Sequence, residues 1–313
     1  MSRLAALTGG TGFLGRHTIR ALADAGWRIR ILTRSAPHLP ELADVPIELI
    51  PGDLGDPTAL RRLCTGADAV VHIAGLVKAP SRGAFMAANA DGTAALVDAW
   101  QGVAAEADFT LVSSMAARAP DLSDYAASKR AGEAHLIAAA APNHRILRPA
   151  AVYGANDSES LKVLKLANGP IQLMLNAPDA RIAMIDARDA ATMIAALVGT
   201  GAGGERYELT DANVDGHRWV DLAHAAAAAL GRSPRPVRVP AFVLKAAGGI
   251  GGSLSALTGS PEMLTRGKVR EILHPDWSGD PGAVVPASIA VPKIELPTGL
   301  TDMVAWARSA NRL

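Results

Sequence analysis

Short apolar runs alternate with helix-like segments along the first half of the chain. The runs lie at residues 4–8, 28–33, 47–50, 69–73, 109–113 and 144–147. The helix-like segments between them lie at 15–25, 57–64, 93–106 and 125–140. Strands separated by helices predict a parallel sheet that is covered on both faces, and such strands are apolar throughout. The pattern therefore predicts an α/β fold with a doubly wound parallel sheet of Rossmann type.

The pattern loses its strict alternation after residue 150. Short strands are expected at 181–185 and 206–209, and a connection or edge strand at 232–240. Helices are expected at 187–198, 219–230, 241–257, 261–273 and 300–310. We therefore expect a dinucleotide-binding domain over residues 1–150. Residues 151–313 should form mainly a small substrate-binding lobe, with some segments returning to the sheet, over the carboxyl edge where ligands of such sheets bind.

Composition excludes several classes of function. Of the 313 residues 49% are hydrophobic, and the net charge of +1 comes with no basic stripe, so a nucleic-acid partner is not expected. The single cysteine, Cys64, excludes an internal disulfide and indicates a reducing compartment. The longest uncharged stretch near the C-terminus, 246–261, is too short and too rich in Gly and Ser to span a bilayer. We expect a soluble cytoplasmic protein, with surface attachment near this stretch as the lesser alternative.

A glycine-rich loop follows the first apolar run. Gly9, Gly12 and Gly15 are spaced three residues apart between the first expected strand and helix. Glycine lets the chain turn sharply, lets the backbone approach a pyrophosphate, and lets the helix pack closely on its strand, while the helix N-terminus offers free N–H groups. An ordinary glycine-rich turn is the alternative. The residues expected at the cofactor are Gly9, Thr11, Gly12, Phe13, Leu14 and Gly15.

The end of the second strand bears on the choice of cofactor. Sites that prefer NAD usually carry an acid there, whereas this chain has Thr33 followed by Arg34. A guanidinium suits a 2′-phosphate, so NADP is the preferred cofactor and NAD the alternative. Arg34 could also be an ordinary surface residue.

Two further strand ends supply candidate cofactor contacts. Asp53, followed by Leu54, could accept a hydrogen bond from the adenine amino group, although a turn aspartate is nearly as good an interpretation. Ala74 and Gly75 are small enough for the backbone to pass close to the adenosine ribose. His72 is expected to be a packed strand residue rather than a catalyst.

Tyr125 and Lys129 carry the candidate chemistry. Four residues apart at the start of a helix, they share one face. An ammonium close to a phenol favours the phenolate and should lower the tyrosine pKa towards neutrality, so that Tyr125 could exchange a proton with a carbonyl or alcohol. Ser113 and Ser114 end the preceding strand, where a hydroxyl could bind the same substrate oxygen. No spacing of histidines or carboxylates supports a metal site.

Together these motifs resemble the extended short-chain dehydrogenase/reductases over nearly the whole chain. The resemblance rests on residues 8–15, 52–54, 72–75, 89–93, 113–114, 125–129 and 148–154. It implies that Ser114 is the catalytic hydroxyl, and that Lys129 also holds the ribose. Pro149, Ala150 and Val152 should line the nicotinamide. It further implies a homodimer formed through helices near 93–106 and 125–140. The C-terminal part is similar to the 3β-hydroxysteroid dehydrogenase-like and epimerase/dehydratase-like branch.

Three functions compete at this point. The first is an NAD(P)-dependent oxidoreductase that moves a hydride between nicotinamide and a carbonyl or secondary alcohol of a small-molecule substrate. The second is a nucleotide-sugar epimerase or dehydratase that retains NAD. The third is a cofactor-binding assembly protein without turnover. Asp189 is expected to cap or brace structure, and Trp219 and Trp277 are expected in the core.

Overall fold

The computed structural model describes residues 2–175, 177–201, 203–258 and 265–313. Its centre is a sheet of seven parallel strands in the order β11-β6-β5-β4-β1-β2-β3. The predicted parallel α/β sheet is thereby confirmed. The strands are β1 (Leu4–Thr8), β2 (Arg28–Thr33), β3 (Ile47–Pro51), β4 (Ala69–His72), β5 (Asp108–Val112), β6 (His144–Pro149) and β11 (Glu205–Leu209).

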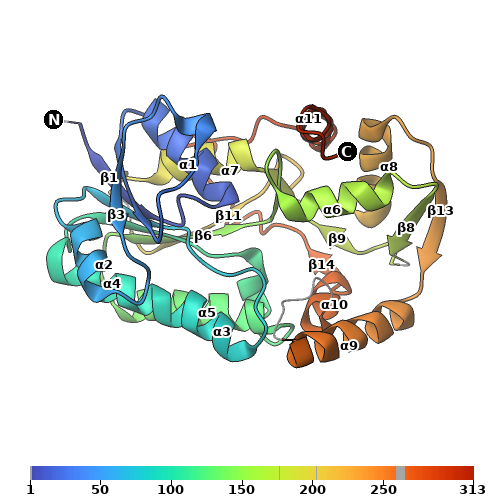
Figure 1. Cartoon of the computed structure of the whole chain (residues 1–313), viewed down its shortest axis with the longest axis horizontal. Coiled ribbons are helices and arrows are strands. Elements are labelled where there is room, and N and C mark those ends of the chain that lie inside the picture. The colour runs from blue at the N-terminus through green and yellow to red at the C-terminus, as the bar shows by residue number, and fades with distance from the viewer. Residues whose placement is uncertain (1, 176, 202, 259–264) are drawn as a thin grey trace.

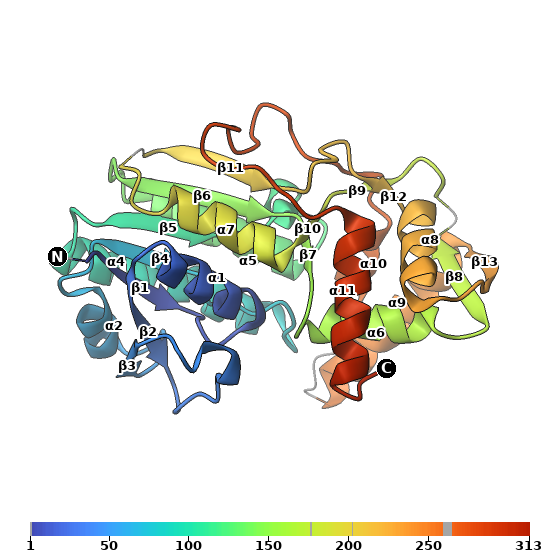
Figure 2. The same cartoon turned by 90° about the horizontal axis from the view of Figure 1, so that it is seen from above.

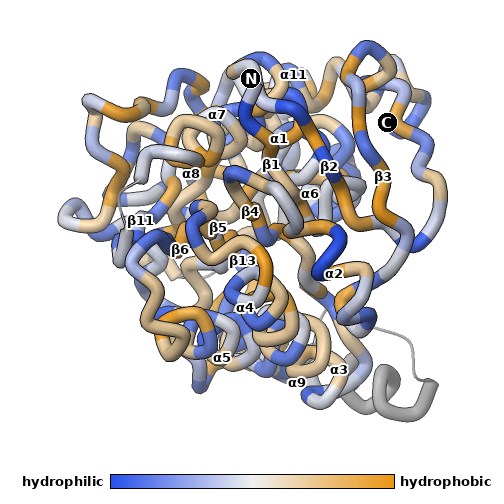
Figure 3. Tube along the Cα trace, turned by 90° about the vertical axis from the view of Figure 1, so that its left-hand side faces the viewer, coloured by the Kyte–Doolittle hydropathy of each residue, from blue (hydrophilic) through white to orange (hydrophobic). Residues whose placement is uncertain are grey.

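Helices cover both faces of this sheet, which is why β1 and β5 near its centre are buried throughout (Figures 1 and 3). On one face α1 (Phe13–Asp24) packs beside α7 (Ala187–Leu197). The other face carries α2 (Pro57–Cys64), α4 (Gly92–Val103) and α5 (Asp124–Ala138). Ile19 and Leu22 of α1 are fully buried in the first layer, as are Leu60 and Leu63 of α2 in the second. Two apolar layers therefore enclose the sheet.

The strand order reverses at β1, which lies between β2 and β4. Loops on either side of such a strand leave in opposite directions and open a crevice at the carboxyl edge of the sheet. The glycine-rich loop follows β1 directly and therefore lies at this crevice.

The lobe forms beside the carboxyl edge and has its own core (Figure 2). The helices α6 (Ser158–Ala167), α8 (Trp219–Leu230) and α11 (Leu296–Ser309) enclose that core. Three small sheets complete the lobe, and two more helices extend it. The sheets pair β7 (Ala151–Tyr153) with β10 (Met184–Asp186), β9 (Arg181–Ile182) with β12 (His217–Arg218) and β14 (Asp276–Trp277), and β8 (Ile171–Leu175) with β13 (Arg235–Val239). The additional helices are α9 (Ala241–Thr258) and α10 (Arg266–Ile272).

Several elements differ from the expected pattern. The segment after residue 150 contributes β7, α6 and β8, none of which had been expected. The helix expected over 261–273 is α10, which begins only at Arg266 because Thr265 caps it, and residues 259–264 lie outside the described residues. The last helix begins four residues early, at Leu296, because Pro297 suits its first turn. Before α4 the chain forms α3 (Arg82–Met86) and a π-helical turn, Ala87–Asp91.

The structure also bears on two further expectations, concerning the structural role of Asp189 and membrane-spanning helices. Asp189 accepts hydrogen bonds from the backbone N–H groups of Lys293 and Ile294, at 2.8 and 2.7 Å, and so braces the C-terminal chain as expected. Within the part of the chain that the structure describes, no helix has the length and apolar character needed to cross a membrane. The stretch 246–261 lies in α9 as far as Thr258, and its last residues lie outside the described part.

Candidate active site

A cleft of about 2240 Å³ runs between the carboxyl edge of the sheet and the lobe. Every residue assigned from the sequence to the cofactor or to catalysis lines it. The structure thus brings together segments from residue 9 to residue 152. What each side chain could do there depends on its local geometry.

The turn between β1 and α1 has the shape of a phosphate cradle. Gly9 has φ +72°, and a Cβ on it would lie 2.5 Å from the backbone nitrogen of Ala74. A Cβ on Gly15 would lie 2.1 Å from the carbonyl oxygen of Gly9. At Gly12 a Cβ would meet only that same oxygen, in a tight contact of 3.2 Å, so this position is less crowded than Gly9 or Gly15. Gly12 caps α1 without any side-chain bond to its first N–H groups, which therefore fit the pyrophosphate of a dinucleotide.

The end of the cleft next to β2 and β3 carries Arg34 and Asp53. Thr33 donates its hydroxyl proton to the carbonyl of Ser35 at 2.6 Å, so the strand end is already fixed. Arg34 is exposed at the cleft and forms no ion pair with any described residue. Asp53 Oδ1 accepts the N–H of Gly55 at 2.8 Å. The turn role suggested for Asp53 is therefore present, and it is compatible with a second role at the cleft.

His72 is a packed strand residue, as expected. Its ring nitrogens lie 2.6 Å from the hydroxyl of Thr8 and 2.9 Å from that of Thr93. Burial, reinforced by the charge of Lys129, lowers the pKa of His72 to about 3. A neutral imidazole therefore joins β1, β4 and α4 beneath the cleft.

Asn89 is a residue whose role the sequence did not assign, although it lies in one of the matching motifs. Its side chain accepts the N–H of Leu76 at 2.7 Å and donates to the carbonyl of Leu76 and the hydroxyl of Ser128, each at 2.9 Å. A Cβ on Gly75 would lie 2.8 Å from Asn89 Oδ1. Asn89, in the π-helical turn, thus holds the loop after β4 against α5.

Tyr125 and Lys129 lie one turn apart near the start of α5, which Ser123 caps. Burial raises the pKa of Tyr125 to about 12; the nearby Ser114 hydroxyl opposes this effect and the charge of Glu271 adds to it. The expected lowering towards neutrality is wrong for this structure, because burial dominates. Lys129 donates to the carbonyl of Val112 at 2.8 Å. Burial lowers the pKa of Lys129 to about 8, against the opposing charge of Glu133.

A buried ion pair supports this helix from behind. Glu133, one turn beyond Lys129, is fully buried and binds Arg148 of β6 through two bonds of 2.8 and 2.6 Å. It also accepts the hydroxyl proton of Ser113 at 2.7 Å. One carboxylate therefore joins α5 to the ends of β5 and β6. Glu133 could not be identified from the sequence, because a single acidic residue in a helix does not indicate which residue it will pair with.

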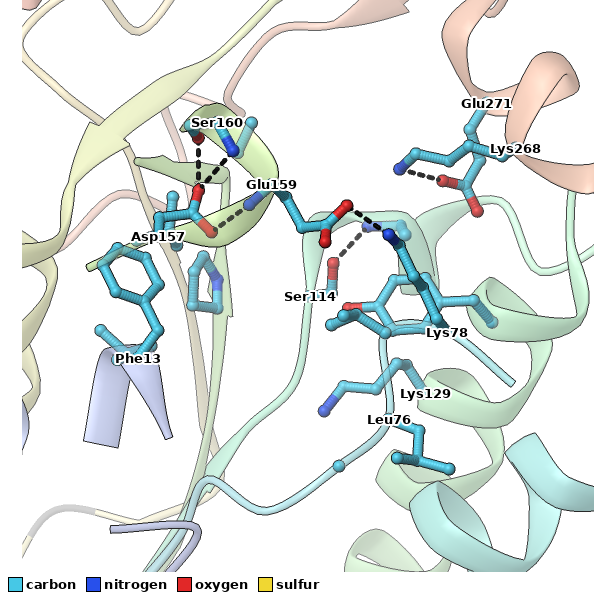
Figure 4. A pocket seen from close by; sticks show the side chains of 18 of the residues that line it. Phe13, Leu76, Lys78, Ser114, Lys129, Asp157, Glu159, Ser160, Lys268 and Glu271 are labelled. Atoms are coloured by element: carbon cyan, nitrogen blue, oxygen red, sulfur yellow. Dashed lines mark hydrogen bonds and ion pairs between the residues drawn. The ribbon is translucent and has the colours of Figure 1, made fainter. Parts of the chain in front are cut away.

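The lobe contributes charged groups to the opposite wall (Figure 4). Glu159 of α6 pairs with Lys78 from the loop after β4, and so connects the two sides of the cleft. Glu271 of α10 binds Lys268 at 3.0 Å and is also hydrogen-bonded to Ser123. These residues come from distant segments and carry no shared motif, so the sequence did not identify them.

The lobe wall also contains a group of apolar side chains. Trp219, expected in the core, is instead half-buried and lines the cleft, and Trp277 lines it while being largely buried. Aliphatic side chains from α6, β8, α8 and α11 continue this wall: Val163, Leu164, Leu166, Ile171, Met174, Leu222, Ala226 and Leu300. The cleft therefore has polar groups near Tyr125 and a set of aliphatic side chains on the lobe side.

Comparison with known proteins agrees with this geometry. The sequence pattern of the NAD dependent epimerase/dehydratase family matches residues 5–210. A ceramide reductase of Caulobacter vibrioides (strain NA1000 / CB15N) is 43% identical over 98% of this chain and 95% of its own length. A (4-alkanoyl-5-oxo-2,5-dihydrofuran-3-yl)methyl phosphate reductase of Streptomyces griseus is 29% identical over 65% of this chain and 66% of its own.

Solved structures share the fold at lower identity. The crystal structure of gox2253 superimposes with a TM-score of 0.78 at 21% identity, over all of both chains. MoeE5 in complex with UDP-glucuronic acid and NAD gives a TM-score of 0.72 at 17% identity, over 98% of this chain and 99% of that one. At these identities the likeness shows a common architecture.

Proposed function

This chain belongs to the NAD dependent epimerase/dehydratase family, and on that premise we propose that it reduces a ketone in a ceramide-class lipid, with NADPH as hydride donor. The chain is an NAD(P)-dependent oxidoreductase. We infer the lipid substrate from the ceramide reductase of Caulobacter vibrioides, because this chain resembles that protein over nearly its full length.

The observation that carries the proposal is the aliphatic wall that the lobe contributes to the cleft. A ceramide combines a polar amide head with two long alkyl chains. The head would lie near Ser114, Tyr125 and Lys268, while the chains would follow the aliphatic wall of α6, β8 and α8. Burial contributes about 0.8 kcal/mol per methylene group, so a long chain gains much of its affinity there. A nucleotide sugar would leave this aliphatic wall without an apolar partner.

The residues around Tyr125 supply the proton chemistry. The hydride for the ketone carbon would come from NADPH held in the cleft. With its pKa raised to about 12, Tyr125 remains a neutral phenol at neutral pH and can donate its proton to the ketone oxygen. The Ser114 hydroxyl can donate a hydrogen bond to the same oxygen. The ketone thereby gains a hydride at carbon and a proton at oxygen, and a secondary alcohol results.

Lys129 and the loop residues hold the cofactor in this proposal. The uncapped N-terminus of α1 would bind the pyrophosphate, and Arg34 would bind the 2′-phosphate of NADP. Lys129 would bind the nicotinamide ribose, and residues 149–152 would line the nicotinamide. Residues 151–313 would contribute most of the substrate contacts, while β11 and α7 from the same segment complete the Rossmann sheet and its cover.

Oxidation of NADPH by purified protein tests the proposal. A ceramide with a ketone in its long-chain base should be reduced, and an analogue with short chains should show a higher KM at similar kcat. UDP-glucose and UDP-glucuronic acid serve as the competing substrates. If the protein reduces no keto-lipid, retains NAD tightly and converts a nucleotide sugar, that combination of results would assign it as an epimerase or dehydratase and overturn the reductase proposal. If the protein binds the cofactor but turns over none of these substrates, the result would instead support the third hypothesis, a cofactor-binding assembly protein.

A further inference from the structure

One end of the lobe combines exposed apolar side chains with an excess of positive charge. We name it the lobe tip and define it as residues 161–171, at the end of α6 and the start of β8, together with residues 231–245, which cover β13 and the first turn of α9. Figures 1 and 2 place β8 and β13 together at the end of the molecule farthest from the N-terminus. The first turn of α9 follows β13 directly along the chain.

The exposed apolar side chains of the tip are large. Phe242 is 71% exposed, Leu166 64% and Val163 60%. Ile171, Val243 and Val237 are exposed by 50%, 43% and 39%. Isolated exposed hydrophobic residues are ordinary, but a group of six from adjoining segments indicates a contact surface.

The charge of the tip is entirely positive. Its two segments contain six basic residues and no Asp or Glu, whereas the whole chain holds 31 basic and 30 acidic residues. The six are Lys162, Lys165, Arg232, Arg235, Arg238 and Lys245. Lys162 is paired with Glu159, and Arg232 donates to the side chain of Asn168. The other four are exposed and form no ion pair with any described residue.

We propose that the lobe tip docks on the surface of an anionic lipid bilayer. Apolar side chains interleaved with Lys and Arg are the composition of segments that lie in the bilayer interface, where the apolar groups enter the headgroup region and the cations meet acidic lipids. A second copy of this chain fits the surface poorly, because a twofold contact would place two sets of unpaired cations against each other.

The tip is continuous with the active-site cleft. Val163, Leu166 and Ile171 belong both to the exposed apolar set and to the cleft wall. A lipid chain leaving the bilayer could therefore reach the cleft along apolar side chains without entering water. This role as the entry for substrate rests on the proposed lipid reductase, whereas docking itself rests only on the surface.

Vesicle flotation of the full chain tests the docking. The probes are vesicles of phosphatidylcholine alone and of phosphatidylcholine mixed with phosphatidylglycerol, at low and high salt. Wild type should bind the anionic vesicles and lose binding as salt increases. Because each cation near an anionic surface contributes roughly a fivefold gain in binding, the double variant Arg235→Glu/Arg238→Glu should bind at least about thirtyfold more weakly. Phe242→Ser should weaken binding about tenfold through lost apolar contact.

Matched controls come from exposed residues elsewhere. Arg61→Glu/Arg62→Glu on α2 changes the same charge, and Val291→Ser removes an apolar side chain that is 47% exposed. Both should bind vesicles as wild type does. The docking proposal is overturned by a wild type that does not bind anionic vesicles, or by controls that lose as much binding as the tip variants. Tip variants that bind vesicles normally but shift the protein from dimer to monomer would assign the tip to a second copy.

A final measurement separates docking from the proposed function. Reduction of the keto-lipid is measured once in detergent micelles and once in anionic vesicles. The tip variants should keep wild-type rates in micelles and lose them only in vesicles. If the proposed reductase function is wrong, the keto-lipid is reduced neither in micelles nor in vesicles, although the protein still binds vesicles. If docking is wrong, vesicle binding is absent while reduction in micelles continues.

Discussion

At the scale of single residues, the protonation state of Tyr125 is the feature closest to the chemistry. The phenol of Tyr125 is half-buried and the ammonium of Lys129 is buried, and this loss of solvent disfavours the charged form of each group. Desolvation therefore raises the pKa of Tyr125 and lowers that of Lys129. In the proposed ketone reduction, Tyr125 would therefore act as the proton donor. Lys129 keeps its carbonyl contact on Val112 and faces the same cleft.

Tyr125→Phe should reduce turnover about 10²- to 10⁴-fold, because general acid catalysis contributes that much to a proton transfer. The affinity for NADPH should change little, since the ring itself remains. Steady-state kinetics and fluorescence titration of the cofactor measure the two quantities. Tyr207→Phe on β11 is the matched control and should keep wild-type turnover. More than a tenth of the activity left in Tyr125→Phe would remove Tyr125 from the role of acid.

Arg34→Ala should change the choice of cofactor. A hydrogen bond to a charged group contributes about 1.5–3 kcal/mol, so wild type should prefer NADP roughly tenfold to a hundredfold. The variant should bind NADP more weakly and NAD almost unchanged. Titration of both cofactors into both proteins provides the test, with Arg61→Ala on α2 as control. Equal affinities in wild type, or a preference that survives the substitution, would mean that Arg34 points away from the 2′ position.

At the scale of elements, the glycines in the turn between β1 and α1 serve two different purposes. Gly9 and Gly15 are required by the fold itself, since a Cβ on either would overlap backbone atoms. Gly12 adopts φ −77°, which any residue tolerates, and a Cβ on it would approach only the Gly9 carbonyl oxygen, at 3.2 Å. The same motif thus contains positions that shape the turn and a position that leaves room for a ligand.

Gly12→Val should therefore abolish cofactor binding while leaving the protein folded, because its branched side chain would project into the space of the pyrophosphate. Gly15→Ala should instead lower the thermal unfolding temperature, since its methyl group would meet the Gly9 carbonyl. Cofactor titration and thermal unfolding of both variants distinguish the two effects. A Gly12→Val protein with wild-type cofactor affinity would place the dinucleotide elsewhere.

The ion pair of Glu133 with Arg148 makes a second prediction at this scale. Glu133→Gln leaves a buried guanidinium without its charge partner, which costs about 3–5 kcal/mol in the free energy of unfolding. The double variant Glu133→Gln/Arg148→Met removes both charges and should regain part of that loss. Denaturant unfolding of the three proteins measures the difference. If the double variant loses further stability, by as much as Arg148→Met alone costs in the wild-type background, the two residues act independently.

At the scale of the whole molecule, the fold and the local motifs could be predicted from sequence, whereas the far wall of the cleft could not. The Gly-rich loop and the Tyr125 and Lys129 pair depend on spacings of three or four residues, which a single segment reveals. The bond between Ser123 and Glu271 joins residues 148 apart in the chain. Such contacts depend on how the lobe closes over the sheet, and neither periodicity nor turn chemistry encodes that closure. The predicted direction of the Tyr125 pKa shift was wrong for the same reason, because the burial of Tyr125 depends on segments that are distant in the sequence.

The outer face of α4 and α5 leads to the last prediction, at the scale of the assembly. Val103 at the end of α4 and Ile137 near the end of α5 are 40% and 45% exposed, and Ala134 is exposed one turn before Ile137. Small and apolar side chains on two neighbouring helices suit a four-helix contact between two copies. Wild type should therefore sediment as a dimer. The variant Ala134→Glu/Ile137→Glu should sediment as a monomer, because four carboxylates would meet across the twofold axis. Val291→Glu, at an exposed apolar site away from these helices, should remain dimeric. A monomeric wild type, or a dimer that survives the double substitution, would place the contact on another face or remove it altogether.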